Sequence, residues 1–375
     1  VYNHSIVYLI LIKLKMRILF LVNHSFVIDF RKELVEALIQ SGDEIYIDCP
    51  REEQPIYYKE IGCHMIDSPI DRRSTNPAKD IKLLFHYYKI FKKVNPDLIL
   101  TYTIKPNIYG GIVARITQHQ YIHTVAGLGS VFLRDMWMKK FVIWLSKFSF
   151  KKSKAVYFLN SDNEQFYHGL GIVDKKIKTI VVPGSGVNIE KFDFCKLENK
   201  PDEFAMVARV LKDKGVSEFI QAARSIKAKY PNTKFHMAGP FDDESLRPEV
   251  KMAISESIIV YHGRLNDVKP LMGQATCVVL PSYGEGCGTV LQEGAALGRP
   301  LITCDTYGCR DNVIDGYNGF LCEVKDAESL ANAMCKYINL TSDQKILMGY
   351  NSRKLAQKYF DRNIVIRAYL DVVRK

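Results

Sequence analysis

The sequence lacks any hydrophobic run long enough to cross a membrane. A transmembrane helix needs about 18 or more consecutive apolar residues, and no such run occurs, although 47% of the 375 residues are hydrophobic. The apolar stretch 5–12 is too short, and it precedes Lys13 and Lys15 instead of following a basic segment, so it is a poor signal peptide. We expect residues 1–15 to form a disordered extension, with the fold beginning at Met16.

Paired cysteines and several common nucleotide-binding motifs are missing as well. The nine cysteines are scattered, and none forms a C-x-x-C pair, which indicates reduced thiols in a cytosolic protein and not a disulfide frame or a zinc site. No G-x-G-x-x-G follows the first expected strand and no G-x-x-x-x-G-K-[ST] occurs, which disfavours a Rossmann dehydrogenase and a P-loop enzyme. No D-x-D lies in a loop suited to a metal, so neither metal nor other cofactor is expected.

What is present is an alternation of strand-length apolar runs with segments of helical periodicity. The first series occupies residues 16–188, and a second series begins again at residue 204 and ends near 359. Residues 189–203 lack periodicity and are predicted to be a linker, and 360–375 are predicted to form a terminal helix that crosses back to the first domain. The pattern predicts an α/β protein of two Rossmann-like domains with parallel sheets, facing a cleft.

The most informative segment lies between residues 275 and 300. An apolar strand at 275–280 precedes a turn with glycines at 284, 286 and 288, and an apolar helix follows. Glu285 lies in the turn and Glu293 one to two turns into the helix. Such a turn lets a backbone approach a ligand closely, and the helix start favours an anion. Two glutamates eight residues apart occur often by chance, but this context favours a carboxylate at each end of a sugar nucleotide.

Two cations follow the first strand of the second series. Arg209 and Lys214 lie in one strand-to-helix loop closed by Gly215. Fixed cations can stabilise the negative charge of a departing diphosphate without a metal. Alone, the pair would favour a solvated basic loop; beside the glutamate motif it favours a donor site.

These motifs together resemble family 4 of the retaining glycosyltransferases, which have the GT-B fold. The resemblance is strongest over residues 183–321 and weaker over 16–132. Within that family the segments 105–110, 125–130 and 305–310 are similar to bacterial enzymes that extend polyprenyl-diphosphate-linked glycans for capsule, O-antigen or N-glycan assembly.

The resemblance implies retaining, metal-independent transfer of a hexose or N-acetylhexosamine from a UDP-sugar. It implies that Arg209 and Lys214 neutralise the diphosphate, that Glu285 contacts the sugar and that Glu293 accepts hydrogen bonds from the ribose. The expected donor site comprises Arg209, Lys214, Glu285, Gly286, Cys287, Gly288, Thr289 and Glu293, the first three of which are expected to act in catalysis. Cys287 departs from the family, where a bulkier apolar residue or proline is frequent, and this leaves the donor sugar open.

The acceptor is expected to bind the first domain, beyond the ends of its strands. The candidates are His24, Arg31, Lys105, Asn107 and His123. Lys105 suits the acceptor pyrophosphate. A histidine in a loop, such as His24, is often structural, and His123 can equally be buried in its strand.

The segment 134–154 carries seven basic residues, one acidic residue and both tryptophans of the chain. Basic and aromatic side chains on one helix suit the surface of an anionic bilayer. The candidates for that contact are Lys139, Lys140, Trp144, Lys147 and Lys151. A helix packed on the sheet with a solvated basic face is the other interpretation, and RNA binding is disfavoured because no RNA-binding motif accompanies the patch.

The expected partners are therefore a nucleotide sugar, a polyprenyl-diphosphate-linked glycan and an anionic membrane surface, without nucleic acid. The expected location is the cytoplasm, peripheral on the inner face of the cytoplasmic membrane. Two other functions stay open: a non-catalytic scaffold that binds sugar nucleotide, and a GT-B sugar-nucleotide epimerase. Intact donor residues count against the scaffold, and an epimerase would need no basic amphipathic helix.

Overall fold

The computed structural model describes residues 15–72, 74, 76–127 and 136–375. All but the last residue of the predicted extension 1–15 lie outside the described residues. The chain divides into two compact units. Unit 1 consists of residues 1–158, 165–180 and 368–375, and unit 2 consists of residues 159–164 and 181–367.

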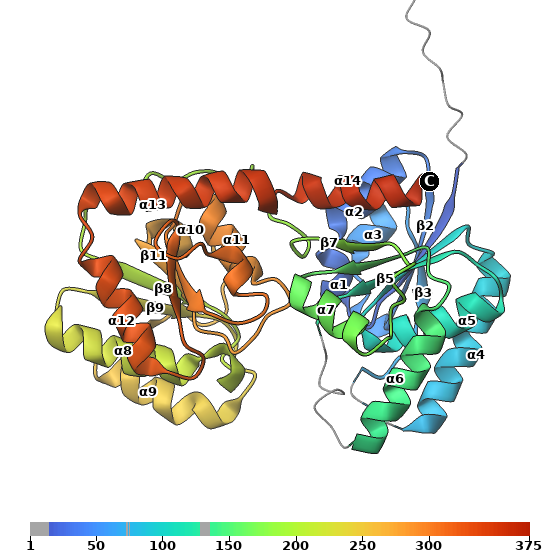
Figure 1. The fold of residues 1–375 in the computed structure, drawn as a ribbon, viewed down its shortest axis with the longest axis horizontal. Helices are drawn as coiled ribbons and strands as arrows, with labels where there is room; N and C mark the ends of the chain where they lie inside the picture. The colour runs from blue at the N-terminus through green and yellow to red at the C-terminus, as the bar shows by residue number, and fades with distance from the viewer. Residues whose placement is uncertain (1–14, 73, 75, 128–135) are drawn as a thin grey trace, which may run out of the picture. The chain divides into compact units, whose positions relative to one another are not determined.

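Unit 1 is built on a seven-stranded sheet with the order β3-β2-β1-β4-β5-β6-β7 (Figure 1). Its strands are β1 Arg17–Leu21, β2 Glu44–Cys49, β3 His64–Asp67, β4 Leu98–Tyr102, β5 Tyr121–Val125, β6 Ala155–Phe158 and β7 Thr179–Val181. Its helices are α1 Ser25–Asp29, α2 Lys32–Gln40, α3 Ile56–Glu60, α4 Pro77–Val94, α5 Gly111–Ile116, α6 Met136–Phe150 and α7 Ser161–Gly169, with short turns η1 Arg51–Glu53 and η2 Pro106–Gly110.

Unit 2 is built on a six-stranded sheet with the order β10-β9-β8-β11-β12-β13. Its strands are β8 Glu203–Val207, β9 Lys234–Ala238, β10 Val260–Tyr261, β11 Cys277–Leu280, β12 Leu301–Cys304 and β13 Gly319–Cys322. Its helices are α8 Val216–Lys229, α9 Arg247–Ser255, α10 Lys269–Gln274, α11 Thr289–Ala296, α12 Ala327–Ile338, α13 Ser342–Leu355 and α14 Arg362–Val373, with short turns η4 Lys212–Lys214, η5 Glu244–Leu246, η6 Arg310–Asn312 and η7 Ala356–Phe360.

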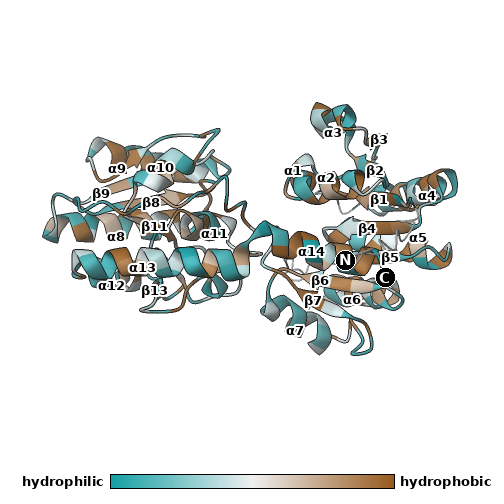
Figure 2. Ribbon diagram, turned by 90° about the horizontal axis from the view of Figure 1, so that it is seen from above, coloured by the Kyte–Doolittle hydropathy of each residue, from teal (hydrophilic) through white to brown (hydrophobic). Residues whose placement is uncertain are grey.

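Both sheets are parallel and covered by helices, which explains their sequences. Central strands such as β4 and β11 are buried at every position, because helices on both faces leave no solvent-exposed side. In Figure 2 the strands are accordingly brown while the outer faces of many helices are teal. Two parallel sheets of this kind confirm the predicted pair of Rossmann-like α/β units.

Residues 189–203, which the sequence predicts to be a linker, pack within unit 2. Phe192 is buried in the same core as α11, and the Cys195 amide donates to the Leu297 carbonyl at 3.1 Å. The buried guanidinium of Arg299 donates to the carbonyls of Cys195 and Ala275. These contacts occur at irregular positions along the chain. The segment therefore has an ordered structure without the hydrophobic periodicity of a helix or strand.

The C-terminal residues complete the core of unit 1. The Tyr369 ring stacks on Tyr157 with centroids 4.0 Å apart, and its hydroxyl lies 2.8 Å from Thr124 Oγ1. Arg374 pairs with Asp43 through both carboxylate oxygens. The helix predicted over 360–375 is observed as α14, whose last residues belong to unit 1 and whose first residues belong to unit 2.

One glycine shows how tightly the loops of unit 2 are packed. Gly215, between η4 and α8, has a φ of 73°, and a Cβ there would meet the Pro281 carbonyl oxygen at 2.1 Å. Gly316 has a nearly identical φ of 74°, with no atom within 4 Å of the added Cβ. The two positions therefore separate backbone strain from steric overlap.

We predict that Gly316→Ala lowers the free energy of unfolding by about 1–2 kcal/mol, the cost of left-handed backbone in a residue with a Cβ. Gly215→Ala carries that cost and the overlap with Pro281 as well, so its loss is expected to be larger. Thermal or denaturant unfolding of the two variants measures both losses. Equal losses would mean that the loop after β11 moves freely to make room.

Candidate functional site

The carboxyl ends of two neighbouring strands in unit 2 bring together the loops that carry Arg209, Lys214 and Glu285. β8 and β11 are adjacent in the sheet, and each leads through a loop into a helix. The loops are joined by hydrogen bonds: the Tyr283 amide donates to the Asp213 carbonyl at 2.9 Å, and the Ser282 hydroxyl donates to it at 3.2 Å. Ligands of open parallel sheets bind at this edge.

The first result of this junction is an ion pair between Lys214 and Glu285. The lysine Nζ lies 2.5 Å from Glu285 Oε1, and the two side chains are only 17% and 16% exposed. Two residues that are 71 positions apart are thus placed side by side, as a donor site requires. The ammonium has further N–H donors that this carboxylate does not occupy.

Arg209 is placed on the same loop but has a different partner. Its Nη1 donates to Asp242 Oδ2 at 2.5 Å, and about half of its side chain is exposed. Asp242 lies in the loop after β9, and no sequence motif marks it as the partner of Arg209. An acidic residue after the neighbouring strand was the signal available for this partner.

Two carbonyl groups of the glycine-rich turn accept hydrogen bonds from the amide side chains of asparagines. Asn160 Nδ2 donates to the Gly286 carbonyl at 2.8 Å, and Asn312 Nδ2 donates to the Cys287 carbonyl at 3.1 Å. A trans peptide directs its C=O and N–H to opposite sides. The N–H groups that share a peptide with these carbonyls therefore point away from the two side-chain amides, and the start of α11 supplies further N–H groups without partners inside the helix. Sequence reasoning missed both asparagines.

The segment after β12 packs against the glycine-rich turn that carries Glu285. The Glu285 amide donates to the Tyr307 carbonyl at 3.1 Å. Gly308 has a φ of 68°, and a Cβ there would meet the Glu285 carbonyl oxygen at 2.1 Å. Residues 305–310 thus fix the position of the Glu285 backbone by direct contact.

The packing of Cys287 gives a physical reason for a small residue at this position. A Cβ on Gly184 would lie 2.2 Å from Cys287 Sγ, so the thiol fills the space that the glycine leaves. The Sγ also lies 3.4 Å from Thr289 Oγ1. A bulkier side chain at 287 would overlap the backbone at 184.

Glu293 lies farther along α11 and is partly buried. Burial raises the pKa of Glu293 to about 7, an increase that Lys191 and Arg362 oppose and Asp267 reinforces. Near neutral pH this carboxyl group is therefore divided between its two protonation states, and a ligand that donates hydrogen bonds to it would favour the ionised one.

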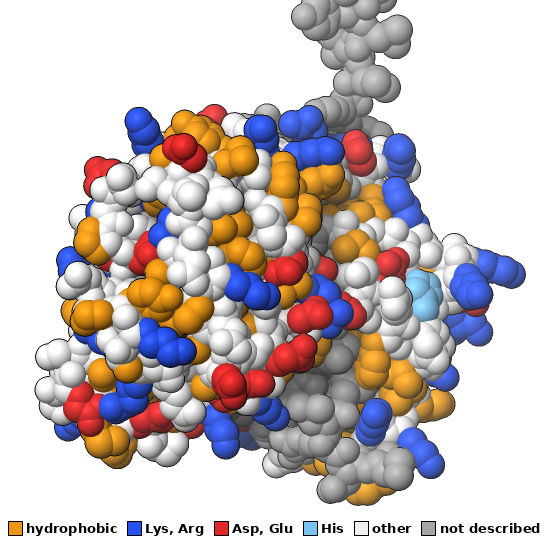
Figure 3. Space-filling model, turned by 60° about the vertical axis from the view of Figure 1, so that its left-hand side comes forward, with side chains coloured by type: hydrophobic (Ala, Val, Ile, Leu, Met, Phe, Trp, Pro, Cys, Tyr) orange, Lys and Arg blue, Asp and Glu red, His pale blue; other side chains and the backbone are white. Residues whose placement is uncertain are grey.

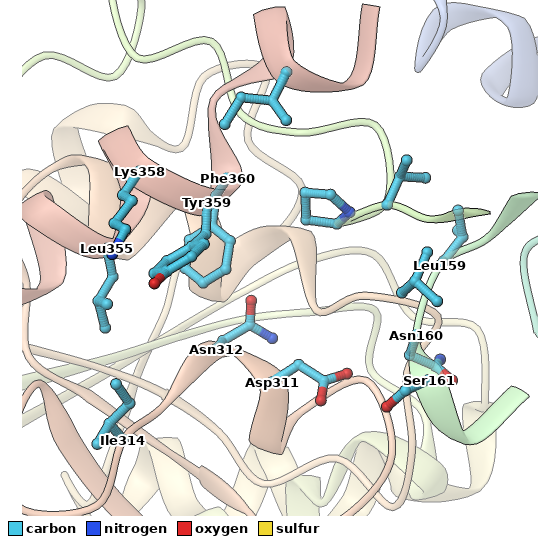
Figure 4. Close-up of a pocket in the computed structure, with 14 residues that line it drawn as sticks. Leu159, Asn160, Ser161, Asp311, Asn312, Ile314, Leu355, Lys358, Tyr359 and Phe360 are labelled. Carbon is cyan, nitrogen blue, oxygen red and sulfur yellow. The ribbon is translucent and has the colours of Figure 1, made fainter. Parts of the chain in front are cut away.

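A cavity of about 540 Å³ lies next to the asparagines that bind the glycine-rich turn, and residues of unit 2 line it (Figure 4). Asn160 and Asn312, which hold the turn, form part of its polar wall beside Asp311. Its other lining residues are Leu159, Ser161, Val181, Val182, Pro183, Ile314, Leu355, Lys358, Tyr359, Phe360 and Ile364. Neither Lys214 nor Glu285 lines it. Within the described residues, no cluster of three or more histidine, cysteine or acidic side chains is arranged to hold a metal ion.

Two of the acceptor candidates in unit 1 have structural partners near the end of β1. His24 caps α1, its Nδ1 accepting from the Phe26 amide at 3.3 Å. Arg31 is only 5% exposed, and its guanidinium lies 5.4 Å from the ring centres of both Tyr102 and Tyr369. The arginine is thus enclosed by aromatic rings.

The Lys105 ammonium is paired inside unit 1. Its Nζ lies 2.7 Å from Asp80 Oδ1, and the Tyr109 hydroxyl donates to the other carboxylate oxygen at 2.8 Å. Asp80 lies 25 positions before this lysine, and no sequence motif links the two.

The other two acceptor candidates lie in the interior. Asn107 is buried and donates to the Thr124 carbonyl at 3.0 Å. His123 is fully buried, its Nδ1 lies 2.7 Å from Thr101 Oγ1, and burial lowers its pKa to about 3. A neutral histidine bonded within the sheet supports the strand ends; acceptor contact by these residues stays a prediction.

Helix α6 exposes both of its tryptophans. Trp137 and Trp144 are 68% and 62% exposed, while Val142 and Phe150 pack toward the sheet. Three of the lysine candidates, Lys140, Lys147 and Lys151, are exposed and Lys139 is partly exposed. The helix therefore packs on the sheet without using its tryptophans. Among helices of the described residues, none is both long and apolar enough to cross a bilayer.

Two family models match most of the chain. The family model described as glycosyl transferases group 1 matches residues 188–355, and the model described as glycosyl transferase 4-like matches residues 17–160. Together they include the site in unit 2 and most of unit 1.

Two curated relatives span most of the chain. The N,N'-diacetylbacillosaminyl-diphospho-undecaprenol alpha-1,3-N-acetylgalactosaminyltransferase of Campylobacter jejuni is 29% identical over 91% of this chain and 93% of its own length. The UDP-Gal:alpha-D-GlcNAc-diphosphoundecaprenol alpha-1,3-galactosyltransferase of Escherichia coli is 27% identical over 80% and 82%. A glycosyltransferase structure from Rickettsia africae matches with a TM-score of 0.80 at 20% identity, covering 96% of this chain and 97% of that one. The chain is therefore a GT-B glycosyltransferase that belongs to the group 1, family 4-like glycosyltransferases.

Proposed function

We propose that this glycosyltransferase moves a hexose or N-acetylhexosamine from a UDP-sugar to a polyprenyl-diphosphate-linked saccharide in bacterial surface glycan assembly. The observation that carries the proposal is the partly buried Lys214–Glu285 pair beside the N-terminus of α11. The relatives whose names specify undecaprenyl-diphosphate acceptors, one of them with UDP-Gal as its donor, support the classes of donor and acceptor.

In this proposal the donor diphosphate binds between the cations and the start of α11. Lys214 and Arg209 supply fixed positive charge, and the turn held by Asn160 and Asn312 supplies backbone N–H groups. As the bond to the diphosphate breaks, negative charge grows on its oxygens, and preorganised donors stabilise that charge best in the transition state. No metal is required for this role, and none is proposed.

Glu285 is proposed to bind sugar hydroxyls instead of attacking the sugar. An ammonium 2.5 Å from its carboxylate lowers its nucleophilicity, which argues against a covalent glycosyl intermediate. Retention would then follow from displacement on one face of the sugar: the acceptor oxygen bonds to the anomeric carbon, the bond to the UDP oxygen breaks, and a phosphate oxygen of the departing UDP takes the acceptor proton.

Unit 1 is proposed to receive the lipid-linked acceptor at the membrane surface. The tryptophans and lysines of α6 point to solvent, as contact with an anionic bilayer requires. The enzyme would then act as a peripheral protein on the cytoplasmic face of the membrane, where lipid-linked saccharides with diphosphate headgroups are accessible.

We predict that UDP release requires both one specific UDP-sugar and the lipid-linked saccharide. The assay incubates the enzyme with UDP-GlcNAc, UDP-GalNAc, UDP-Gal or UDP-Glc, with and without a polyprenyl-diphosphate saccharide.

In the same assay, Lys214→Ala is expected to lower kcat by about 10²-fold or more, because a fixed hydrogen-bond donor to the departing diphosphate is lost. Chelation of metals should leave the rate unchanged.

Other results of that assay identify the alternatives. Donor binding without release for any lipid acceptor would favour a scaffold. Conversion of the sugar nucleotide to an isomer without acceptor would favour an epimerase.

A second prediction concerns the ribose. If Glu293 accepts hydrogen bonds from both ribose hydroxyls, UDP should bind more tightly than 2′-deoxy-UDP by about 1.5–3 kcal/mol, the contribution of one hydrogen bond to a charged group. In Glu293→Ala the two ligands should bind with nearly equal affinity. Calorimetry on the four combinations measures the coupling, and undiminished discrimination in the variant would contradict the ribose assignment.

A third prediction follows from the raised pKa of Glu293. Ribose hydroxyls favour the ionised carboxylate, so binding lowers the pKa below its free value of about 7. The affinity for UDP should therefore be full above pH 7 and should fall as pH drops below 7, by up to about tenfold per pH unit. In Glu293→Gln this component should vanish, leaving only the titration of UDP itself. A pH profile that is unchanged by the substitution would exclude Glu293 as its source.

A further inference from the structure

Helix α4 carries a second exposed aromatic stripe that the sequence analysis did not identify. Ile81, Phe85 and Tyr88 follow one another at helical spacing, and each is about half exposed or more, with Phe85 at 64%. Leu83 and Tyr87 face the other way, into the core of unit 1. The helix thus has a complete inner apolar face and an additional outer one.

The outer stripe of α4 lies on the same flank of unit 1 as that of α6. Figures 1 and 2 both show α4, α5 and α6 side by side on this flank. The topology requires it: the crossovers from β3 through β4 and β5 to β6 all run in one direction across the sheet, so right-handed connections place these helices on one face. Ile116, at the end of α5, is also exposed.

The charge of this flank is mainly positive. Residues 98–161, which include α5 and α6, contain nine lysines and arginines and one acidic residue. Lys82, Lys89 and Lys92 are exposed on α4, whose only acidic residue, Asp80, is bonded to Lys105. On the face of unit 2 that Figure 3 shows, acidic and basic side chains are interspersed instead.

We propose that α4, α5 and α6 form a single lipid-facing surface, and that α4 enters the interface of an anionic bilayer together with α6. This surface, the α4–α6 flank, extends the membrane contact proposed above for α6 alone. Aromatic and aliphatic side chains would enter the headgroup region while the lysines bind anionic headgroups. A nucleic acid would use the lysines but would leave Ile81 and Phe85 without a role.

The second stripe has a geometric consequence. One amphipathic helix on a bilayer leaves a globular unit free to roll about the helix axis, whereas two stripes on separate helices fix its orientation. The predicted acceptor residue Lys105 pairs with Asp80, the neighbour of Ile81 on the first turns of α4. A diphosphate at the headgroup level would thus meet Lys105 at one end of the α4–α6 flank.

The experiment uses tryptophan emission, because both native tryptophans, Trp137 and Trp144, lie on α6. In a Trp137→Phe/Trp144→Phe background, Phe85→Trp places the sole indole on α4. Vesicles of phosphatidylglycerol and phosphatidylcholine should shift its emission to the blue, and brominated lipid should quench it. The matched control in the same background is Ile56→Trp, on α3, which is 72% exposed and lies across the sheet because the crossovers from β1 to β3 run the opposite way.

A second variant removes the stripe without changing charge. Ile81→Ser/Phe85→Ser/Tyr88→Ser should weaken binding to the same vesicles by about tenfold or more, since the buried apolar area contributes directly to interfacial affinity. Its turnover of a water-soluble, short-chain acceptor should be unchanged. That assay separates failure of the surface from failure of the transferase proposal on which the choice of partner rests.

Three results would overturn the inference. In the first, vesicles shift the native tryptophans but leave the indole at position 85 unchanged, so that α6 alone meets the bilayer. In the second, neither helix responds, so the flank is not lipid-facing. In the third, the indole at position 85 shifts with protein concentration in the absence of vesicles, which would make the stripe an interface between proteins.

Discussion

The proposed donor site depends on the junction between the loops that follow β8 and β11. The Asp213 carbonyl accepts hydrogen bonds from the Tyr283 amide and the Ser282 hydroxyl, and this backbone contact places Lys214 within 2.5 Å of Glu285. A parallel sheet directs the carboxyl ends of neighbouring strands to one edge, so residues distant in sequence meet there. Without that junction the lysine and the glutamate would be two ordinary charged loop residues.

Further hydrogen bonds hold the glycine-rich turn beside this junction in place. The Tyr307 carbonyl accepts a hydrogen bond from the Glu285 amide, and Asn160 and Asn312 donate to the next two carbonyls of the turn. Asn312 ends η6, in the same connection between β12 and β13 as residues 305–310, and Asn160 follows β6, so two distant segments of the chain meet at one turn. The turn can then present N–H groups to an anion without reorganisation when the ligand binds.

Unit 1 buries some of its polar side chains and exposes some of its apolar ones. His123 in β5 and Asn107 in η2 are hydrogen-bonded in the interior, whereas several apolar side chains of α4 and α6 are exposed. Exposed aromatic stripes on a basic flank are consistent with a partner that is itself apolar and anionic.

The sequence by itself determined the two Rossmann-like series, because strand-length apolar runs alternating with helical periodicity allow few other folds, and it determined the donor motif, because its glycines and glutamates are close in the chain. Only the tertiary structure decided the partners of those residues: Asp242 for Arg209, Asp80 for Lys105, and the asparagines behind the turn. It also decided which face of α6 is buried, since periodicity shows that a helix has an apolar stripe but not whether another layer covers it. Contacts between distant segments are set by packing, and local patterns carry no record of them.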